Sequence, residues 1–478
     1  MKLSNHLLIA PMFAVALALS ACGSDDDDAL EVDESAIDSG EVDADADSAD
    51  ADGDTESDTD TDSENVTVAE TDTDTDADAG GDTDAGGDTE AGGDADTGGD
   101  TDAGGDTDAD GDTDTETDTD SDTGSSRAIV NTVDVGFTSA VVDIIETSEP
   151  FTSEGNFNPG VSDTIVRAFE DNYYVIRRFM SDSIAAYNIA DPTTPLYEFS
   201  TNSDSEEASS NPHDLIFLNT EKAYLLRYGS PIMWVVNPSA TTIEEFMLSE
   251  IDLSAFDADG VPNATRGVIV GDNLFIIMQR LDEAFTPTQP GFVAVVDTAT
   301  DTLIDPGTSD ALPGIELPAF NPADVSVDES TGTIFISAFG DFGAFDGSRP
   351  PALTGGVVAL DTADFSAVQL IDDNDGTGRI NNVEITSASR GYIVTEESFG
   401  TASLDQFSPV TGQIEALGVA GLSGVDIRDL AVGPQGNLWV AVADPTSPRV
   451  VVINPADNSV VADGIPTTQN PTSLAFTE

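Results

Sequence analysis

Cysteine and basic residues are scarce in this sequence. It has one Cys, at position 22, two His, and 14 Lys and Arg against 93 Asp and Glu, giving a formal net charge of −79 over 478 residues. A single cysteine excludes intrachain disulfides and metal sites built from several Cys. The negative charge excludes binding to DNA or RNA through phosphate neutralisation, so no nucleic-acid partner is expected.

The charge is unevenly distributed and divides the chain into regions. Residues 23–126 contain 42 Asp and Glu and no Lys or Arg, whereas residues 127–478 contain 51 acidic and 13 basic residues, a net charge of −38. The first of these segments is composed almost entirely of Asp, Thr, Ala, Gly, Ser and Glu, and it cannot bury enough apolar surface to fold. We therefore expect residues 22–126 to form a disordered acidic tether before a folded domain at residues 127–478.

The N-terminal 21 residues have the features of an export signal. Lys2 precedes an apolar run from Leu7 to Ala21, which is too short for a comfortable membrane span. The run ends Leu19-Ser20-Ala21-Cys22, which resembles the lipobox of bacterial lipoproteins. The resemblance implies a lipid on Cys22, and Gly23 after it favours an outer-membrane lipoprotein on the periplasmic or cell-surface face. The alternative is an ordinary secretory signal in which the Cys occurs by chance.

One stretch of the tether invites comparison with a calcium loop. Asp106, Asp108 and Asp110 with Gly111 match the first half of an EF-hand, but Thr117 stands where the bidentate Glu is required. Only weak, diffuse Ca²⁺ association is expected there, and no other cofactor is expected.

Residues 127–478 repeat a short β pattern seven times. One recurring unit is an apolar strand that ends at Asn, Asp or Ser, and the seven copies end at Asp143, Asn188, Asn237, Asp297, Asp361, Ser408 and Asn454. A second unit precedes it in six copies and carries an aromatic residue: Tyr174, Tyr224, Phe275, Phe335, Tyr392 and Trp439. Such units of three or four strands predict an all-β, seven-bladed β-propeller, in which the aromatic residues fill the core.

A third unit precedes the second and predicts how the propeller closes. Its clearest forms begin at Asn211-Pro212, Asn321-Pro322 and Asn470-Pro471. The copy at Asn470 has no later strands, and the first copy of the recurring unit has no earlier innermost strand. We therefore expect both chain termini to build the last blade, which leaves no open edge strand.

The domain resembles YVTN-type seven-bladed propellers. The resemblance is carried by Val295-Val-Asp-Thr-Ala-Thr300, by the Asn-Pro strand starts and by the hairpin Gly433-Pro-Gln-Gly-Asn-Leu-Trp439. It implies a fold that hosts binding proteins, adhesins, scaffolds and lactone-cleaving enzymes, so it indicates fold more than function. The long segments before Asp297 and Asp361, including 339–351, are expected to be loops on one face, and the protein is expected to be a monomer.

Polar residues are predicted to gather on one face of the propeller. In propellers of this kind the starts of the innermost strands meet the loops after the second strands around a central channel. From this mapping we expect a ligand-binding set of Arg177, Arg227, Arg266, Arg280, His213, Asp214 and Asp324, with Asn382, Arg428, Asp429, Arg178, Glu396 and Glu397 on the same face. Guanidinium groups suit the recognition of carboxylate, phosphate or sulfate. The competing interpretation is structural, with the Asp residues accepting backbone N–H groups and the Arg residues pairing with them.

A binding module for a protein, a glycan or a small anion is therefore the expected function, and no catalytic residues are assigned. The alternative is a metal-assisted lyase or lactone hydrolase on the channel face. A Ser–His–Asp mechanism would depend on His213, the only His of the domain, and a His-rich zinc site is excluded. Asp214, Asp324 and Glu396 could supply oxygen ligands for Ca²⁺ or Mg²⁺. Convergence of these groups would favour an enzyme, whereas Arg–Asp pairs filling the channel would favour a binding protein.

Overall fold

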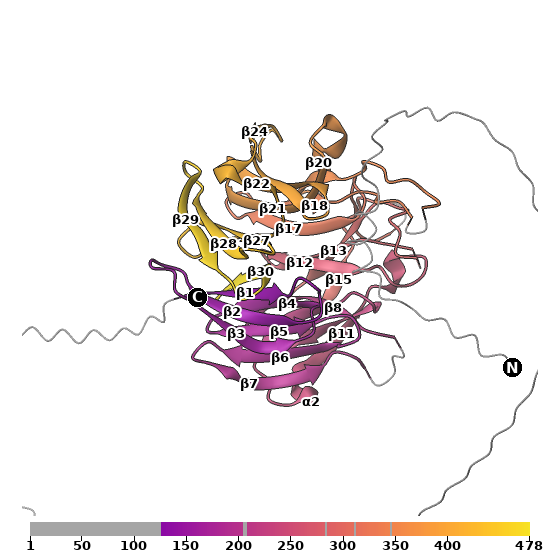
Figure 1. Ribbon diagram of the computed structural model, residues 1–478. Helices are drawn as coiled ribbons and strands as arrows, with labels where there is room; N and C mark the ends of the chain where they lie inside the picture. The colour runs from indigo at the N-terminus through magenta and orange to yellow at the C-terminus, as the bar shows by residue number, and fades with distance from the viewer. Residues whose placement is uncertain (1–125, 204–207, 283, 310–311, 345–346) are drawn as a thin grey trace, which may run out of the picture. The chain divides into compact units, whose positions relative to one another are not determined.

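The computed structural model describes residues 126–203, 208–282, 284–309, 312–344 and 347–478. Almost all regular structure in them is β-strand, in seven antiparallel sheets of four or five strands (Figure 1). The seven-bladed β-propeller is confirmed. The expected signal peptide, the lipidation site at Cys22 and the acidic tether up to residue 125 lie outside the described residues.

The first three blades follow one another along the chain, each beginning with its innermost strand. The first contains β4 (Thr164–Phe169), β5 (Asn172–Arg177), β6 (Ser183–Asn188) and β7 (Asp191–Ser200). The second contains β8 (Pro212–Asn219), β9 (Lys222–Arg227), β10 (Ile232–Val236) and β11 (Met247–Asp252). The third contains β12 (Ala264–Val270), β13 (Asn273–Met278), β14 (Phe292–Asp297) and β15 (Thr302–Ile304), and β16 (Ile315–Glu316) also pairs with β14.

The next three blades repeat this order. The fourth contains β17 (Pro322–Asp328), β18 (Thr333–Ala338), β19 (Gly356–Asp361) and β20 (Ala367–Asp372). The fifth contains β21 (Arg379–Ser387), β22 (Arg390–Ser398), β23 (Thr401–Phe407) and β24 (Ile414–Ala416), and β25 (Ser423–Val425) also pairs with β23. The sixth contains β26 (Ile427–Val432), β27 (Leu438–Val442), β28 (Arg449–Asn454) and β29 (Ser459–Pro466).

The seventh blade is built from both ends of the domain, as predicted. Its strand order is β3-β2-β1-β30, from β1 (Arg127–Val133), β2 (Ala140–Glu146), β3 (Ser153–Gly160) and β30 (Asn470–Phe476). Figure 1 shows yellow β30 beside indigo β1, and the two pair antiparallel from Ala128 with Phe476 to Val133 with Asn470. The closure leaves β30 as the innermost strand of this blade.

Hydrophobic packing joins each blade to the next. Seven clusters of buried apolar side chains occur in the described residues, one between each pair of adjacent blades. The aromatic residues of the second strands belong to these clusters, and none of the six is more than 3% exposed. The core is thus a ring of seven interfaces, and loss of one blade would uncover two of them.

Helical structure in the described residues is limited to single turns: α2 (Ile243–Phe246), η2 (Ser254–Phe256), η3 (Asp373–Asp375) and η4 (Val419–Gly421). Within the described ranges, no helix has the length and apolar character that a bilayer crossing demands. The two expected long loops connect β13 to β14 and β18 to β19. Both join a second strand to a third strand, so they lie on the same face as the starts of the innermost strands.

Candidate functional site

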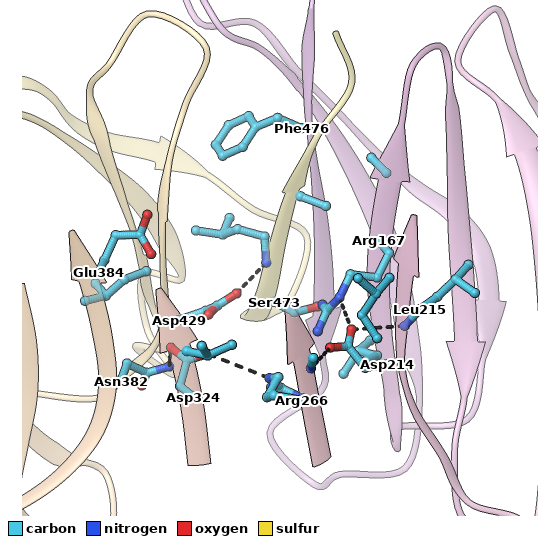
Figure 2. Close-up of a pocket in the computed structure, with 18 of the residues that line it drawn as sticks. Arg167, Asp214, Leu215, Arg266, Asp324, Asn382, Glu384, Asp429, Ser473 and Phe476 are labelled. Carbon is cyan, nitrogen blue, oxygen red and sulfur yellow. Dashed lines mark hydrogen bonds and ion pairs between the residues drawn. The ribbon is translucent and has the colours of Figure 1, made fainter. Parts of the chain in front are cut away.

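The innermost strands of all seven blades line a cavity of about 490 Å³ at the centre of the propeller (Figure 2). Cavities of roughly 300–1,000 Å³ are typical of sites for small molecules. The lining combines charged and polar side chains with apolar ones, and the charged groups come from strands far apart in the sequence: Arg167, Asp214, Arg266, Asp324, Glu384, Arg428 and Asp429. This cavity is the candidate functional site.

A β-bulge near the start of the innermost strand positions those side chains that lie nearest the strand starts, which we call the upper level of the cavity. In six blades one residue of the inner strand is skipped in the pairing with the second strand, and in the second blade it is His213. The extra residue brings Asp214, rather than His213, opposite Leu226. The residues brought to this level are Asp214, Arg266, Asp324, Asn382, Asp429 and Ser473. We call these six residues the upper ring.

The strand β4 contributes Arg167, which lies deeper in the cavity than the upper ring. Its register with β5 is continuous, and Arg167 pairs opposite the aromatic Tyr174. Glu384 occupies the corresponding position in the fifth blade, opposite Tyr392. Neither residue was predicted from the sequence, because only the starts of the innermost strands were expected to face the channel.

Two ion pairs lie on one side of the cavity. Arg167 Nε lies 2.6 Å from Asp214 Oδ1, and Arg266 Nε lies 3.7 Å from Asp324 Oδ1. Burial opposes the charge of Arg167, but the attraction of Asp214 outweighs it and raises the pKa of the guanidinium. Each arginine also donates from Nη1 to a carbonyl of its own strand. Within the described residues the Nη2 groups of Arg167 and Arg266 have no hydrogen-bond partner, so both remain available to a ligand.

The acceptors of the upper ring also connect neighbouring blades. Asp214 Oδ2 accepts the backbone N–H of Gly267 at 3.1 Å, and Asp429 Oδ2 accepts that of Leu474 at 2.7 Å. Ser473 Oγ accepts the N–H of Val166 at 3.1 Å in the same way. Each bond joins one inner strand to the inner strand of the next blade. Asp214 therefore has the structural role considered from the sequence, as an acceptor of a backbone N–H group, and it also forms part of the cavity wall.

The other side of the cavity carries carboxyl groups without arginine partners. Among the described residues, neither Glu384 nor Asp429 forms an ion pair. Burial, together with the negative charge of Asp324, raises the pKa of Asp429 to about 7 and raises the pKa of Glu384 well above its usual range. The pKa of Asp324 is also raised by burial, against the attraction of Arg266. The cavity therefore favours the protonated form of these carboxyl groups more than water does.

The structure brings three of the seven predicted ligand-binding residues into the cavity, namely Asp214, Arg266 and Asp324. Arg227 is instead buried outside the cavity lining, where it donates to the carbonyl of Ile232 in its own blade and to that of Thr201, which follows the last strand of the first blade. It also lies 4.3 Å from the ring of Trp234. Backbone carbonyls from two blades thus satisfy this long side chain away from the cavity.

The remaining three residues also lie outside the cavity lining. Arg177 pairs with Glu198 of the outermost strand at 2.9 Å. Arg280 lies over Phe292 and donates to Gln289 Oε1 at 2.8 Å. His213, the bulged residue, is 1% exposed and stacks on Tyr228 with ring centroids 4.0 Å apart. Burial and the nearby arginines lower the pKa of His213 well below its usual value. The ligand-binding roles assigned to these residues remain predictions.

The groups considered for metal-assisted chemistry do not come together. His213 is turned away from the cavity, and Glu396 accepts a hydrogen bond from Asn381. Over the part of the chain that the structure covers, no three His, Cys, Asp or Glu side chains are grouped so that they could hold a metal ion. Arg–Asp pairs occupy the channel instead, which is the arrangement expected of a binding protein.

Comparison with solved structures supports the fold. A protein from Bacteroides uniformis, provisionally named a 6-phosphogluconolactonase, is 13% identical with a TM-score of 0.51, and the match covers 74% of this chain and 100% of the other. A protein from Lactobacillus plantarum is 13% identical with a TM-score of 0.50, and this match covers 74% and 99%. No protein-family model matches the chain, and no curated protein is significantly similar to it. At this identity the likeness establishes the propeller architecture and nothing about activity.

Proposed function

We propose that the protein is an exported binding protein whose central cavity holds an oxyanionic group of a small molecule or glycan. The observation that carries the proposal is the pair of guanidinium groups, Arg167 and Arg266, in a cavity lined by all seven inner strands. Their Nη2 atoms have no hydrogen-bond partner in the part of the chain that the structure describes. Charge-assisted hydrogen bonds from such groups contribute roughly 1.5–3 kcal/mol each. The hydroxyl and amide groups of Ser473 and Asn382 would hold hydroxyl groups of the same ligand.

Titration calorimetry of the full-length chain at about pH 6 tests this proposal. Sulfate, phosphate and galacturonate are expected to bind, whereas uncharged galactose is expected to bind more weakly. Arg167→Gln and Arg266→Gln should each reduce the affinity for sulfate at least about tenfold. Arg390→Gln is the matched control, because it removes the same charge at the far end of the β21–β22 hairpin. Binding of none of these anions, or equal losses in all three variants, would reject the cavity as the site.

We also propose that Cys22 carries a lipid and that the propeller is a YVTN-type module held at the outer membrane. Support comes from the Leu19-Ser20-Ala21-Cys22 motif and from the Asn-Pro strand starts. Two or more acyl chains hold a protein firmly at a membrane, since each buried CH₂ contributes about 0.8 kcal/mol. Cys22→Ser should move the protein from the membrane fraction to the soluble fraction or leave it unprocessed. Unchanged fractionation of this variant would refute the anchor and leave the binding proposal standing.

A further inference from the structure

We propose that Asp429 binds the same ligand as a hydrogen-bond donor in its protonated form, so that the cavity takes up an oxyanion together with a proton. This inference rests on the proposed binding function and adds a regulatory property to it, namely release of the ligand as the solution becomes alkaline. It also assigns a ligand contact to the side of the cavity where the carboxyl groups have no arginine partner among the described residues.

The hydrogen bonds of Asp429 fix where its proton would lie. Oδ2 accepts the N–H of Leu474 at 2.7 Å, which suits a carbonyl oxygen. Among the described residues Oδ1 has no partner, and the half-buried side chain lines the cavity. A proton on Oδ1 would therefore face the ligand and donate to one of its oxygens.

The charged groups around Asp429 favour this protonated form. Asp324 on β17 faces it with negative charge. Glu384 on β21 also faces the cavity, but burial raises its own pKa well above its usual range, and β27 and β30 contribute no titratable side chain. Arg167 on β4 and Arg266 on β12 attract it, but they lie closer to Asp214 and Asp324. Arg428, on its own strand, is held by Asp426 through bonds of 2.7 and 2.5 Å. With burial added, these groups raise the pKa of Asp429 to about 7.

The consequence for binding follows from charge. Below pH 7, neutral Asp429 donates a hydrogen bond to the anion; above pH 7, the ionised carboxylate repels it. A bound anion disfavours the ionised form further, so binding near neutral pH draws a proton from solution. We expect the affinity for an anion of constant charge to fall about tenfold or more between about pH 6 and about pH 8.5.

Sulfate is the appropriate probe, because its own charge does not change over this range, whereas that of phosphate does. Titration calorimetry of the full-length chain is performed at both pH values, with ionic strength held constant with NaCl. Repeating the titration at pH 7 in buffers of different ionisation enthalpy gives the number of protons taken up. A positive number approaching one is expected, and this measurement requires no variant.

Asp429→Asn provides the second arm, and Asp463→Asn is its control. The amide can accept the Leu474 N–H through oxygen and donate through nitrogen, so this variant should bind sulfate at pH 8.5 as the native chain does at pH 6. Asp463 is an exposed acid on β29 of the same blade, and its variant should keep the native pH dependence. Sulfate binding that is independent of pH, with no proton uptake, overturns this inference but leaves the proposed function intact. No sulfate binding at either pH overturns both.

Discussion

The interior of the blades and the wall of the central cavity use arginine in opposite ways. Arg227 is 1% exposed, and it donates to the Ser230 hydroxyl and the Ile232 carbonyl of its own blade and to the carbonyl of Thr201, just after the first blade. Arg167, in the cavity lining, pairs with one carboxylate and one carbonyl, and its Nη2 has no hydrogen-bond partner among the described residues. A fully satisfied charge stabilises the fold, whereas a partly satisfied one is available to a ligand. The stability of the fold should therefore depend on residues inside the blades, and ligand binding on residues of the cavity wall. Mutations at the two places should then affect either stability or binding.

Removal of the closing strand should have the largest effect. Deleting residues 470–478 takes Leu474 out of one interblade cluster and Ala475 out of another, and it exposes the edge of β1. Each large apolar side chain lost contributes roughly 1.5–3 kcal/mol, so the shortened chain should show no cooperative thermal transition. Deleting Glu478 alone is the control and should leave the melting curve unchanged. Equal midpoints for the full-length chain and the chain ending at residue 469 would show that β30 is not required for closure.

Substitution of Arg227 should have the next largest effect. Arg227→Ala leaves the carbonyls of Thr201 and Ile232 buried without donors and removes the contact with Trp234. The free energy of unfolding should fall by about 2–4 kcal/mol in a denaturant titration. Arg390→Ala, at the surface, should change it by less than about 0.5 kcal/mol. If Arg227→Ala instead abolished sulfate binding and left the stability of the domain unchanged, the proposed difference in role between arginines inside the blades and arginines of the cavity wall would be wrong.

The Asp429→Asn variant should change how stability depends on pH. The folded pKa of Asp429, about 7, lies above the ordinary value of 3.8, so the native state retains a proton that the unfolded chain releases between these values. The free energy of unfolding of the native chain should therefore decrease as pH rises from about 4 to about 7 and then level off. Asp429→Asn lacks this loss, so its free energy of unfolding should rise by about 2 kcal/mol relative to that of the native chain over this interval. The difference is smaller than the full pKa shift implies, because water in the cavity screens part of the repulsion. Parallel pH profiles for the two proteins would contradict the raised pKa.

Salt should have the smallest effect and should act on the outer surface. The domain carries 51 acidic and 13 basic residues, and their repulsion is screened as the Debye length falls from about 10 Å in 0.1 M salt to about 3 Å in 1 M. The thermal midpoint should rise by about 5 °C over this range, equally in the native chain and in Arg227→Ala. A flat or falling midpoint would show that repulsion does not dominate the electrostatics of the domain.

The fold was predictable because its signals are local and repeated. Seven strand ends, six aromatic residues and the isolated unit at Asn470 were sufficient to predict seven blades and their closure. The aromatic residues are buried because each belongs to the middle of a second strand, and the position in the strand determines its packing. Such information is present in the spacing of residues along the chain.

The cavity wall was predicted only in part, for two physical reasons. Arg167 and Glu384 lie opposite Tyr174 and Tyr392, two residues further along their strands than the level of the upper ring, so a pattern of strand starts does not indicate them. The direction of a long side chain is set by the nearest acceptor, and Arg227 donates to the carbonyl of Ile232 in its own blade and to that of Thr201 after the first blade. Asp214, Arg266 and Asp324 were predicted correctly because side chains at the upper ring are short or face the channel. Such side chains have fewer directions open to them, so their position in the strand is enough to place them.

The pairing of β1 has a mechanical consequence. The segment that precedes residue 126 is joined to a strand held on both edges, by seven pairs with β2 and six with β30. The backbone carbonyl of Arg127 accepts the N–H of Thr477, and its N–H donates to the hydroxyl of Thr477, at 2.9 Å each. A pull along β1 therefore shears two ladders at once instead of peeling one bond at a time. If the chain is anchored through Cys22, tension from the membrane would enter the propeller at one of its mechanically strongest points, and it would be shared by the first and last strands of the domain.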